Sequence, residues 1–184
     1  VRQCYEAGIT VTSLPGACAC ITALTMSGQP TRRFAFEAFL PYDKKERAQI
    51  LENLRNETRT IIIYEAPHHL KKTLKECREY LGNRNMTVCK ELTKRYEQKR
   101  KSTLDEMIAY YEENEPRGEY VLIFEGKSLQ ELKEEKQQEW NQLTVQEHMK
   151  YYLEKGMDKK SAMKQVAKDR GVSKRDIYQE LLKK

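Results

Sequence analysis

The chain has 184 residues, of which 39% are hydrophobic and 34% are charged, and its formal net charge is +6. This length accommodates one substantial domain with a small appendage, and the composition predicts a modest core under a charged surface. No apolar run approaches the roughly 20 residues that span a bilayer, so the sequence excludes a transmembrane helix. The first residues, VRQCYEAGI, lack the apolar stretch of a signal peptide and are typical of the middle of a longer chain.

The first two-thirds of the chain alternate between strand and helix patterns. Gly28 and Gly82 stand where glycine commonly ends a helix, and Pro67 stands in the first turn of another helix. Strands that alternate with helices of 10 to 15 residues predict an α/β sandwich with a mixed sheet. The expected strands are residues 8–14, 33–40, 58–66, 86–92, 96–103 and 118–126, and the expected helices are residues 16–28, 43–55, 67–81 and 103–113.

The last third shows helical patterns and no strand pattern. Residues 128–143 are charged and predict a helix or a linker, and further helices are expected at 144–154, 159–170 and 174–183. The sequence RGVS predicts a tight turn at Gly171 with Ser173 as the next N-cap. A helix-turn-helix that binds nucleic acid fits this pattern, and a plain helical hairpin is the alternative. The expected apolar face comprises Ala162, Val166, Ala167, Ile177, Tyr178 and Leu181, and the basic cluster comprises Lys174, Arg175, Lys183 and Lys184.

The positive charge is concentrated in two separate segments. Residues 84–101 carry seven Lys or Arg against two acidic residues, and residues 155–184 carry ten against four. Residues 102–154, between them, carry five basic against thirteen acidic residues. Such segments indicate either an anionic partner, of which nucleic acid is the usual one, or two solvated faces. The candidates for RNA contact are Lys94, Arg95, Lys159, Lys160, Lys174 and Arg175.

The cysteines indicate a cytosolic protein with reduced thiols. Five cysteines, an odd number, occur without a C-x-x-C pair. The three histidines have no zinc-ligand spacing to them, so we expect no metal site.

Candidate catalytic residues lie at strand ends and at one helix start. Glu65 and Glu91 close expected strands and Glu119 opens another, so these carboxylates either converge on one site or are ordinary edge charges. His68, in the pair His68–His69 after Pro67, is either a base or a solvated residue at a helix end. Gly16, after Pro15, permits a sharp turn and close approach of a ligand or another backbone.

Five segments in fixed order carry a family resemblance: SLPGACACITAL, RFAFEAFLP, TIIIYEAPHHL, KELTKRYE and RGEYVLIFEG. Together with the tail KKSAMKQVAKDRGVSKRDIYQELLKK, they resemble the RsmI-type family of bacterial ribosomal RNA small-subunit methyltransferases. That family belongs to the tetrapyrrole (precorrin/corrin) methylase superfamily. The resemblance implies transfer of a methyl group from S-adenosylmethionine to the ribose 2′-hydroxyl of a cytidine in 16S ribosomal RNA. It also implies a homodimer in the cytoplasm that acts on ribosomal RNA or the 30S subunit.

The resemblance also implies that the chain is a C-terminal fragment with four parts. Residues 1–14 would end a truncated N-terminal domain, and residues 15–127 would form the C-terminal α/β methyltransferase subdomain. Residues 128–143 would be a charged linker and residues 144–184 a small helical RNA-binding domain. Because the family binds its cofactor between two α/β domains, we expect this fragment alone to be inactive.

The matching motifs assign candidate site residues. The cofactor-binding candidates are Pro15, Gly16, Tyr64, Glu65, Glu91, Leu92, Thr93, Gly118, Glu119, Tyr120 and Val121. A ribose hydroxyl is a weak nucleophile, and the candidates for a general base are Glu65, Glu37 and His68. The sequence departs from the family at Ala17, at Ala38, where Gly is usual, and at His69, where Arg is usual. Two alternatives stay open: a tetrapyrrole methyltransferase, or an RNA-binding module without activity.

Overall fold

The structure is a computed structural model that describes residues Val1–Leu182. It divides into two compact units, the first comprising Val1–Gly126 and the second beginning at Lys127. Lys183 and Lys184, which belong to the predicted basic cluster, lie outside the described residues. Among the residues that are described, no helix is both long and apolar enough to cross a membrane.

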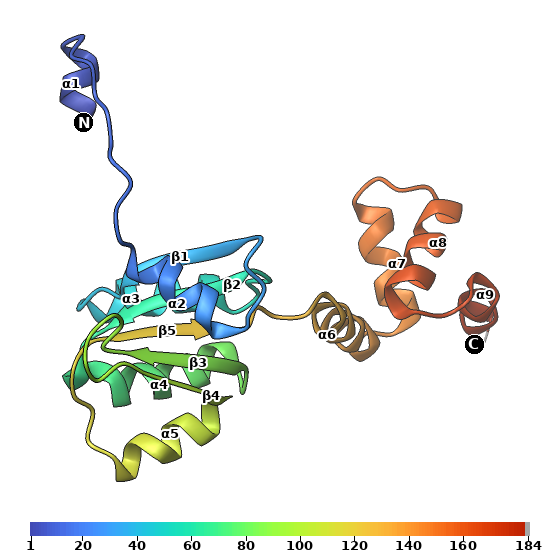
Figure 1. Cartoon of the computed structure of the whole chain (residues 1–184). Helices are drawn as coiled ribbons and strands as arrows, with labels where there is room; N and C mark the ends of the chain where they lie inside the picture. The colour runs from blue at the N-terminus through green and yellow to red at the C-terminus, as the bar shows by residue number, and fades with distance from the viewer. Residues whose placement is uncertain (183–184) are drawn as a thin grey trace. The chain divides into compact units, whose positions relative to one another are not determined.

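A five-stranded mixed sheet forms the centre of the first unit (Figure 1). The strand order is β1-β2-β5-β3-β4, in which β1 and β2 are parallel and the other neighbours are antiparallel. The strands are β1 (Phe34–Phe39), β2 (Thr60–Glu65), β3 (Asn85–Lys90), β4 (Gln98–Thr103) and β5 (Tyr120–Phe124). This architecture confirms the predicted α/β fold with a mixed sheet.

Helices cover both faces of this sheet. On β2, Ile61 and Ile63 point into a large core formed with α3 (Lys44–Leu54), α4 (Pro67–Leu81) and α5 (Leu104–Glu113). Ile62, between them, points to the opposite face and packs against α2 (Ala19–Ser27). Figure 1 shows α2 on one side of the sheet and α4 with α5 on the other. The alternation of side chains along a strand therefore explains why the uninterrupted run Ile61–Ile63 is buried on both faces.

Local sequence signals set the helix boundaries. The Asp43 carboxylate accepts hydrogen bonds from the first backbone N–H groups of α3, and Thr103 forms a capping box with Glu106 at the start of α5. Pro67 occupies the first turn of α4, and Gly28 ends α2 in the left-handed conformation with φ 71°. The helices predicted at 43–55, 67–81 and 103–113 are thereby confirmed.

The strand predicted at residues 8–14 is wrong. These residues follow a short helix, α1 (Arg2–Glu6), and form neither helix nor strand; none of the five described strands pairs with them. Ile9 and Leu14 are exposed. Alternating β-branched residues favour an extended backbone, but a strand needs hydrogen bonds from a neighbouring strand.

As far as Leu182, the second unit consists of four helices around a small core. They are α6 (Leu129–Gln142), α7 (Val145–Glu154), α8 (Lys159–Arg170) and α9 (Lys174–Leu182). Gly171 turns the chain with φ 66°, and the Ser173 hydroxyl accepts a hydrogen bond from the Asp176 N–H at 3.2 Å, as predicted for this turn. The turn fits both a helix-turn-helix and a plain helical hairpin. The core contains Met149, Ala162, Met163, Val166, Ala167 and Ile177. Tyr178, predicted on the apolar face, is exposed instead, because it follows Ile177 on a helix that buries only one side.

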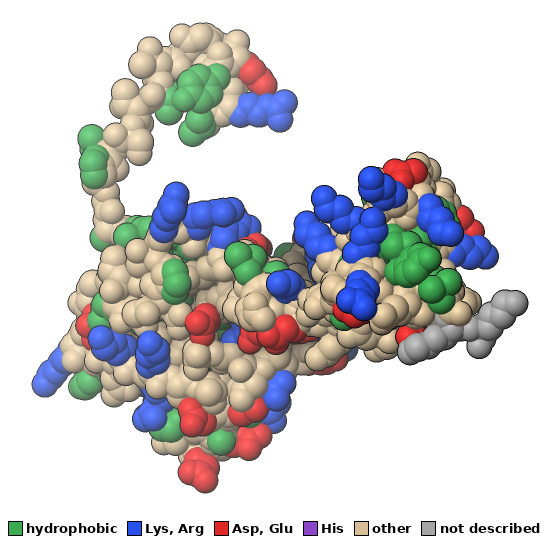
Figure 2. Space-filling model, turned by 90° about the vertical axis from the view of Figure 1, so that its right-hand side faces the viewer, with side chains coloured by type: hydrophobic (Ala, Val, Ile, Leu, Met, Phe, Trp, Pro, Cys, Tyr) green, Lys and Arg blue, Asp and Glu red, His purple; other side chains and the backbone are tan. Residues whose placement is uncertain are grey.

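The candidate RNA-contact residues of this unit are all exposed. Lys159 and Lys160 lie in the first turn of α8, and Lys174 and Arg175 lie in the first turn of α9. Figure 2 shows Lys and Arg side chains spread over the visible face of this unit around an exposed apolar patch. Exposed cations at the start of the second helix are compatible with contacts to phosphate, and the RNA role stays a prediction.

A stacked histidine and tryptophan join α6 to the rest of this unit. The rings of Trp140 and His148 lie 3.9 Å apart at an interplanar angle of 5°. His148 is fully buried; its Nδ1 accepts a hydrogen bond from Arg170 Nε at 3.2 Å. Its Nε2 lies 3.4 Å from the Asp169 carboxylate, yet forms no hydrogen bond with any described residue. Burial, followed by the Arg170 charge, lowers the pKa of His148 below its ordinary 6.5.

We expect the second unit to lose stability as the pH falls below 6.5. The unfolded chain then protonates His148 more readily than the folded unit does, so acid favours unfolding. Trp140 is the single tryptophan of the chain, so its fluorescence in urea follows this unit selectively. In His148→Gln the urea midpoint should change less between pH 7 and pH 5.5 than in the wild type. Equal changes in the two proteins would show that His148 does not carry the effect.

Candidate functional site

The predicted motifs meet at one edge of the sheet. Glu65 is paired with Tyr120 across β2 and β5, and Lys90 is paired with the same Tyr120 across β3 and β5. Phe39 is paired with Tyr64 at the same edge of the parallel pair β1–β2. Glu65, Glu91 and Glu119 therefore share one end of the sheet, where the carboxyl ends of β1, β2 and β3 lie. Ligands of α/β proteins commonly bind at the carboxyl ends of parallel strands.

Tyr64 connects this edge to the start of α2. Its hydroxyl oxygen accepts a hydrogen bond from the Cys20 backbone N–H at 2.9 Å. Its ring has edge-to-face contacts with Phe36 and Phe39, at centroid distances of 4.9 and 5.6 Å. Burial raises the pKa of Tyr64, so the neutral hydroxyl is the form that accepts from Cys20. The aromatic cluster thus fixes the first turn of α2 against the sheet.

Pro15 and Gly16 precede this first turn in an exposed irregular segment, and Gly16 has no positive φ, so the sharp turn predicted there does not form. A Cβ added to Gly16 would meet no atom within 4 Å, so the described residues do not require glycine there. Cys18 is the N-cap of α2, and its Sγ lies 3.7 Å from the Sγ of the buried Cys20. The Ile21 backbone N–H, then Cys20, lower the pKa of Cys18, whereas burial raises the pKa of Cys20 to about 11. The five cysteines are free thiols, as predicted.

Glu91 clamps the two loops that follow β3 and precede β5. Its Oε1 accepts hydrogen bonds from the Glu119 N–H at 2.9 Å and from Lys94 Nζ at 3.2 Å, and these partners lower the pKa of Glu91 in that order. Lys94 also donates to Glu119 at 2.7 Å, so its ammonium is shared between two carboxylates. Gly118 has φ 82°, and a Cβ there would lie 2.6 Å from Glu91 Oε1. Glycine is therefore required where Glu91 crosses the loop.

The other candidates around this clamp differ in exposure. Leu92 packs partly buried against the α2 core, beside the buried Val121. Thr93 has φ 62° and donates its backbone N–H to Glu97 at 2.7 Å. Arg95, a candidate for RNA contact, lies with its guanidinium 5.7 Å from the Tyr96 ring centroid. These roles in cofactor and RNA binding stay predictions.

Glu65 points away from Tyr64, toward α3 and α4. Its side chain is only 5% exposed. Oε1 accepts the Ala66 N–H at 2.8 Å, and Oε2 accepts the Thr73 hydroxyl and lies 3.9 Å from Arg47 Nη2. Arg47 in turn donates to Thr73 at 2.6 Å and to Glu76 at 2.5 Å. A buried carboxylate is thus held by a backbone N–H, a hydroxyl and a nearby guanidinium, as buried charges require.

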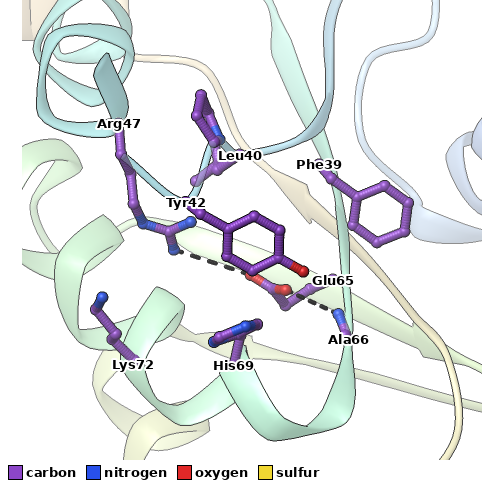
Figure 3. A pocket seen from close by; sticks show the side chains of 9 residues that line it. Phe39, Leu40, Tyr42, Arg47, Glu65, Ala66, His69 and Lys72 are labelled. Atoms are coloured by element: carbon purple, nitrogen blue, oxygen red, sulfur yellow. Dashed lines mark hydrogen bonds and ion pairs between the residues drawn. The ribbon is translucent and has the colours of Figure 1, made fainter. Parts of the chain in front are cut away.

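A pocket opens above this carboxylate (Figure 3). Its volume is about 340 Å³, and it lies between the end of β1, the following loop, and the first turns of α4. The pocket is lined by Phe39, Leu40, Pro41, Tyr42, Arg47, Glu65, Ala66, His69 and Lys72. Figure 3 shows the Tyr42 ring projecting across the pocket, with Arg47 and Lys72 on one side and Phe39 on the other. The arrangement combines an aromatic mouth with a charged floor.

The remaining catalytic candidates lie around this pocket or on β1. His68 is exposed, and its ring lies 4.3 Å from the ring of His69, which lines the pocket. Glu37 is half-buried on β1 beside Ala38, whose φ of 52° accompanies a shift of strand register. Ala38 replaces the glycine usual in the family, and its positive φ explains why glycine suits that position.

Sequence reasoning missed the partners of Glu65. Arg47 lies on the apolar face of α3 with Leu51 and Leu54, and Thr73 lies on the apolar face of α4 beside Leu70. Both residues are polar at positions where the helical period predicts core. A buried polar residue needs a partner, so this mismatch was the available signal for a buried network. Within the described residues no group of three potential metal ligands occurs.

Comparison with known proteins gives three findings. Residues 1–108 match the family model "Tetrapyrrole (Corrin/Porphyrin) Methylases". Proteins named "Ribosomal RNA small subunit methyltransferase I" from Halalkalibacterium halodurans and Bacillus subtilis are 46% and 44% identical over 178 residues, which is 97% of this chain. The chain spans 61% of the length of each of these relatives. The crystal structure of the methyltransferase CobJ shares the fold, with a TM-score of 0.52 and 16% identity over 66% of this chain and 53% of that one.

Proposed function

The chain belongs to the tetrapyrrole methylase family, and from that membership we propose that it forms part of an S-adenosylmethionine-dependent methyltransferase of small-subunit ribosomal RNA. The observation that carries this proposal is the 46% identity, over nearly the whole chain, to a relative with that name. We propose the ribose 2′-hydroxyl of a cytidine as the acceptor, from the resemblance of the five motifs. A homodimer and a cytoplasmic location are proposed on the same basis.

The residues at the sheet edge fit a cofactor with a nucleoside and an amino-acid part. In the first turn of α2 the Cys20 N–H donates to Tyr64 and the Ile21 N–H acts on the Cys18 thiol, so the Ala19 N–H is the group that would meet a carboxylate. Leu92 and the ring of Tyr64, both partly buried, supply apolar surface beside it. When bound, S-adenosylmethionine would supply an electrophilic methyl group. The chain would bind it through these groups and through backbone atoms of residues 118–121.

The protein's contribution to methyl transfer would be positioning and handling of one proton. Alignment of two bound reactants lowers a barrier by about 7–11 kcal/mol in favourable cases. A base near the ribose would accept the hydroxyl proton, and Glu65, Glu37 and His68 stay the candidates. His68 is the most exposed of the three, whereas Glu65 is buried and both of its carboxylate oxygens already accept hydrogen bonds.

The test is methylation of small-subunit RNA with labelled S-adenosylmethionine, followed by nucleoside mass spectrometry. Because the chain spans 61% of the relatives' length, it is assayed alone and within a protein of their full length; we expect turnover only from the latter. A 2′-O-methylcytidine product supports the proposal. Methylation of a precorrin but not of RNA would support the tetrapyrrole alternative, and methylation of neither would refute both.

The same assay tests the second unit as an RNA-docking module. Lys174→Ala with Arg175→Ala should raise the KM for RNA and reduce its salt dependence, with kcat little changed, because these cations would contact phosphate. The matched control is Lys150→Ala with Lys155→Ala, in α7 and at its C-cap, outside the predicted helix-turn-helix. If the two double variants raise the KM for RNA equally, overall charge and not the position of Lys174 and Arg175 determines the KM.

A further inference from the structure

Two cysteines at the start of α2 lie side by side. Cys18, the N-cap, is exposed, and Cys20, in the first turn, is only 5% exposed. Their Sγ atoms are 3.7 Å apart, within hydrogen-bond distance for two thiols. We propose that this pair is a site of reversible oxidation, at which hydrogen peroxide converts the two thiols into a disulfide and thereby weakens binding of the cofactor.

The backbone at the start of α2 permits this disulfide. Cys18 is extended, with φ −136° and ψ 112°, and the helix begins at the next residue, so the chain bends between the two cysteines. Residues two apart are separated by at most about 7 Å, and disulfides join Cα atoms about 4.4–6.8 Å apart. The sulfurs have to approach each other by roughly 1.7 Å to bond. A ring that encloses one residue is strained, and strained disulfides are the readily reduced, regulatory ones.

The two thiols differ in the way that a peroxide-sensitive pair requires. The Ile21 backbone N–H, followed by the Cys20 side chain, lowers the pKa of Cys18, so this exposed sulfur reaches the reactive thiolate form more readily. Burial raises the pKa of Cys20 to about 11, so this sulfur keeps its proton until the second step. Cys77 and Cys89 are fully buried, and burial raises the pKa of each. Cys18 is therefore the thiol that we expect to react first.

The oxidation proceeds in two balanced steps. The Cys18 thiolate attacks one peroxide oxygen: the S–O bond forms, the O–O bond breaks, and the departing hydroxide takes up the proton that the Cys18 thiol released, giving water. Cys18 is then a sulfenic acid. The Cys20 sulfur attacks the Cys18 sulfur: the S–S bond forms, the S–O bond breaks, and the departing hydroxide leaves with the Cys20 proton as a second water. Two thiols are oxidised, and one peroxide is reduced to two water molecules.

The disulfide would act on the backbone that is proposed to face the cofactor, so this part of the inference rests on the proposed function. Ala19, whose N–H would meet the carboxylate of the cofactor, is the residue that the ring encloses. The Cys20 N–H donates to the Tyr64 hydroxyl at 2.9 Å, and the Cys20 side chain lies in the core with Ala23 and Ile62. Drawing the Cys20 sulfur toward Cys18 would rotate the first turn of α2 and move the Ala19 N–H with it.

The first experiment measures the oxidation of the 184-residue chain by hydrogen peroxide, with mass spectrometry of the intact chain and of its peptides. We expect a loss of two hydrogen atoms, localised to a peptide that contains Cys18 and Cys20 and reversed by dithiothreitol. Proteolysis after Glu6 separates this peptide from Cys4, so a disulfide to Cys4 would be recognised. Oxidation of Cys18 that stops at sulfenic or sulfinic acid, a disulfide to any other cysteine, or no reaction at Cys18 would overturn the proposal.

Three variants assign the roles of the two thiols. Cys20→Ala should leave Cys18 as a sulfenic acid, which dimedone traps, and form no disulfide. Cys18→Ser should slow the oxidation of Cys20 at least about tenfold, because the accessible thiolate is gone. Cys4→Ser, the matched control at a half-buried cysteine, should leave the disulfide and its rate of formation unchanged. Oxidation of Cys20 at the wild-type rate in Cys18→Ser would contradict the role of Cys18 and overturn the proposal.

The effect on the cofactor is measured in a protein of the relatives' full length, by calorimetric titration with S-adenosylmethionine before and after oxidation. We expect the oxidised protein to bind at least about tenfold more weakly and dithiothreitol to restore the affinity. Cys18→Ser should bind with the same affinity before and after peroxide. Equal affinities of the reduced and the oxidised wild type would overturn the effect on the cofactor. No binding by the reduced wild type would refute the proposed function, whereas the disulfide is established or overturned by the peptide masses alone.

Discussion

Replacing Arg47 by Met is expected to destabilise the first unit by about 2–4 kcal/mol. Arg47 is 7% exposed and contacts Thr73, Glu76 and Glu65, so its loss leaves the buried Glu65 without a positive neighbour. Met retains the unbranched stem and much of the volume, so cavity formation contributes little. Hydrogen exchange in urea, resolved by peptide and followed in β2 and α4, measures the loss of stability in this unit alone.

Two further variants separate the charge effect from packing. Lys75→Met removes an exposed ion pair with Glu112, 3.1 Å long, and should change stability by less than about 1 kcal/mol. The double variant Arg47→Met with Glu65→Gln should regain at least about 1 kcal/mol relative to Arg47→Met, because the buried charge is gone. A double variant no more stable than Arg47→Met would show that Arg47 stabilises the unit by packing rather than by charge.

Most of the fold could be predicted because its signals are local. The Asp43 and Thr103 caps, Pro67 and Gly28 act on neighbouring residues, so the sequence alone places α3, α5, α4 and the end of α2. The prediction of a strand at residues 8–14 was wrong because a strand also needs a partner strand. That requirement is non-local, and the residue pattern does not contain it. Sheet order is equally non-local, since β5, the last strand in the chain, lies between β2 and β3.

The site was predicted in its motifs but not in its interactions. Motif order placed Tyr64, Glu65, Glu91 and Gly118–Val121 among the candidates, and the strand register brings them to one edge. The sequence does not show that Tyr64 and Glu65 point to opposite faces, one toward α2 and the other toward Arg47. That division follows from the register of β2 and from which helix covers each face. The pocket depends on it, because Glu65 lines the pocket and Tyr64 does not.

Gly126→Ala is expected to destabilise the first unit by about 3 kcal/mol or more. A Cβ at Gly126 would lie 2.2 Å from the Thr58 carbonyl oxygen and 2.6 Å from that of Arg59. Both are backbone atoms at the start of β2, so no side-chain rotation relieves the overlap. Moving this segment would also disturb the buried Arg84, whose Nη1 donates to the carbonyl oxygens of Glu57 and Glu125, each at 3.4 Å.

Gly16→Ala is the matched control, since it makes the same chemical change at a glycine whose Cβ would meet no atom within 4 Å. It should change the free energy of unfolding by less than about 0.5 kcal/mol. Hydrogen exchange at β2 and β5 is the measurement, because the overlap at Gly126 acts where these strands begin and end. Equal protection in the two variants would mean that Thr58 and Arg59 shift at little cost. The contrast arises because the requirement for glycine at Gly126 depends on a segment nearly 70 residues away in the chain. At Gly16, in the more conspicuous Pro-Gly motif, an added Cβ would meet no atom of the described residues beyond its chain neighbours.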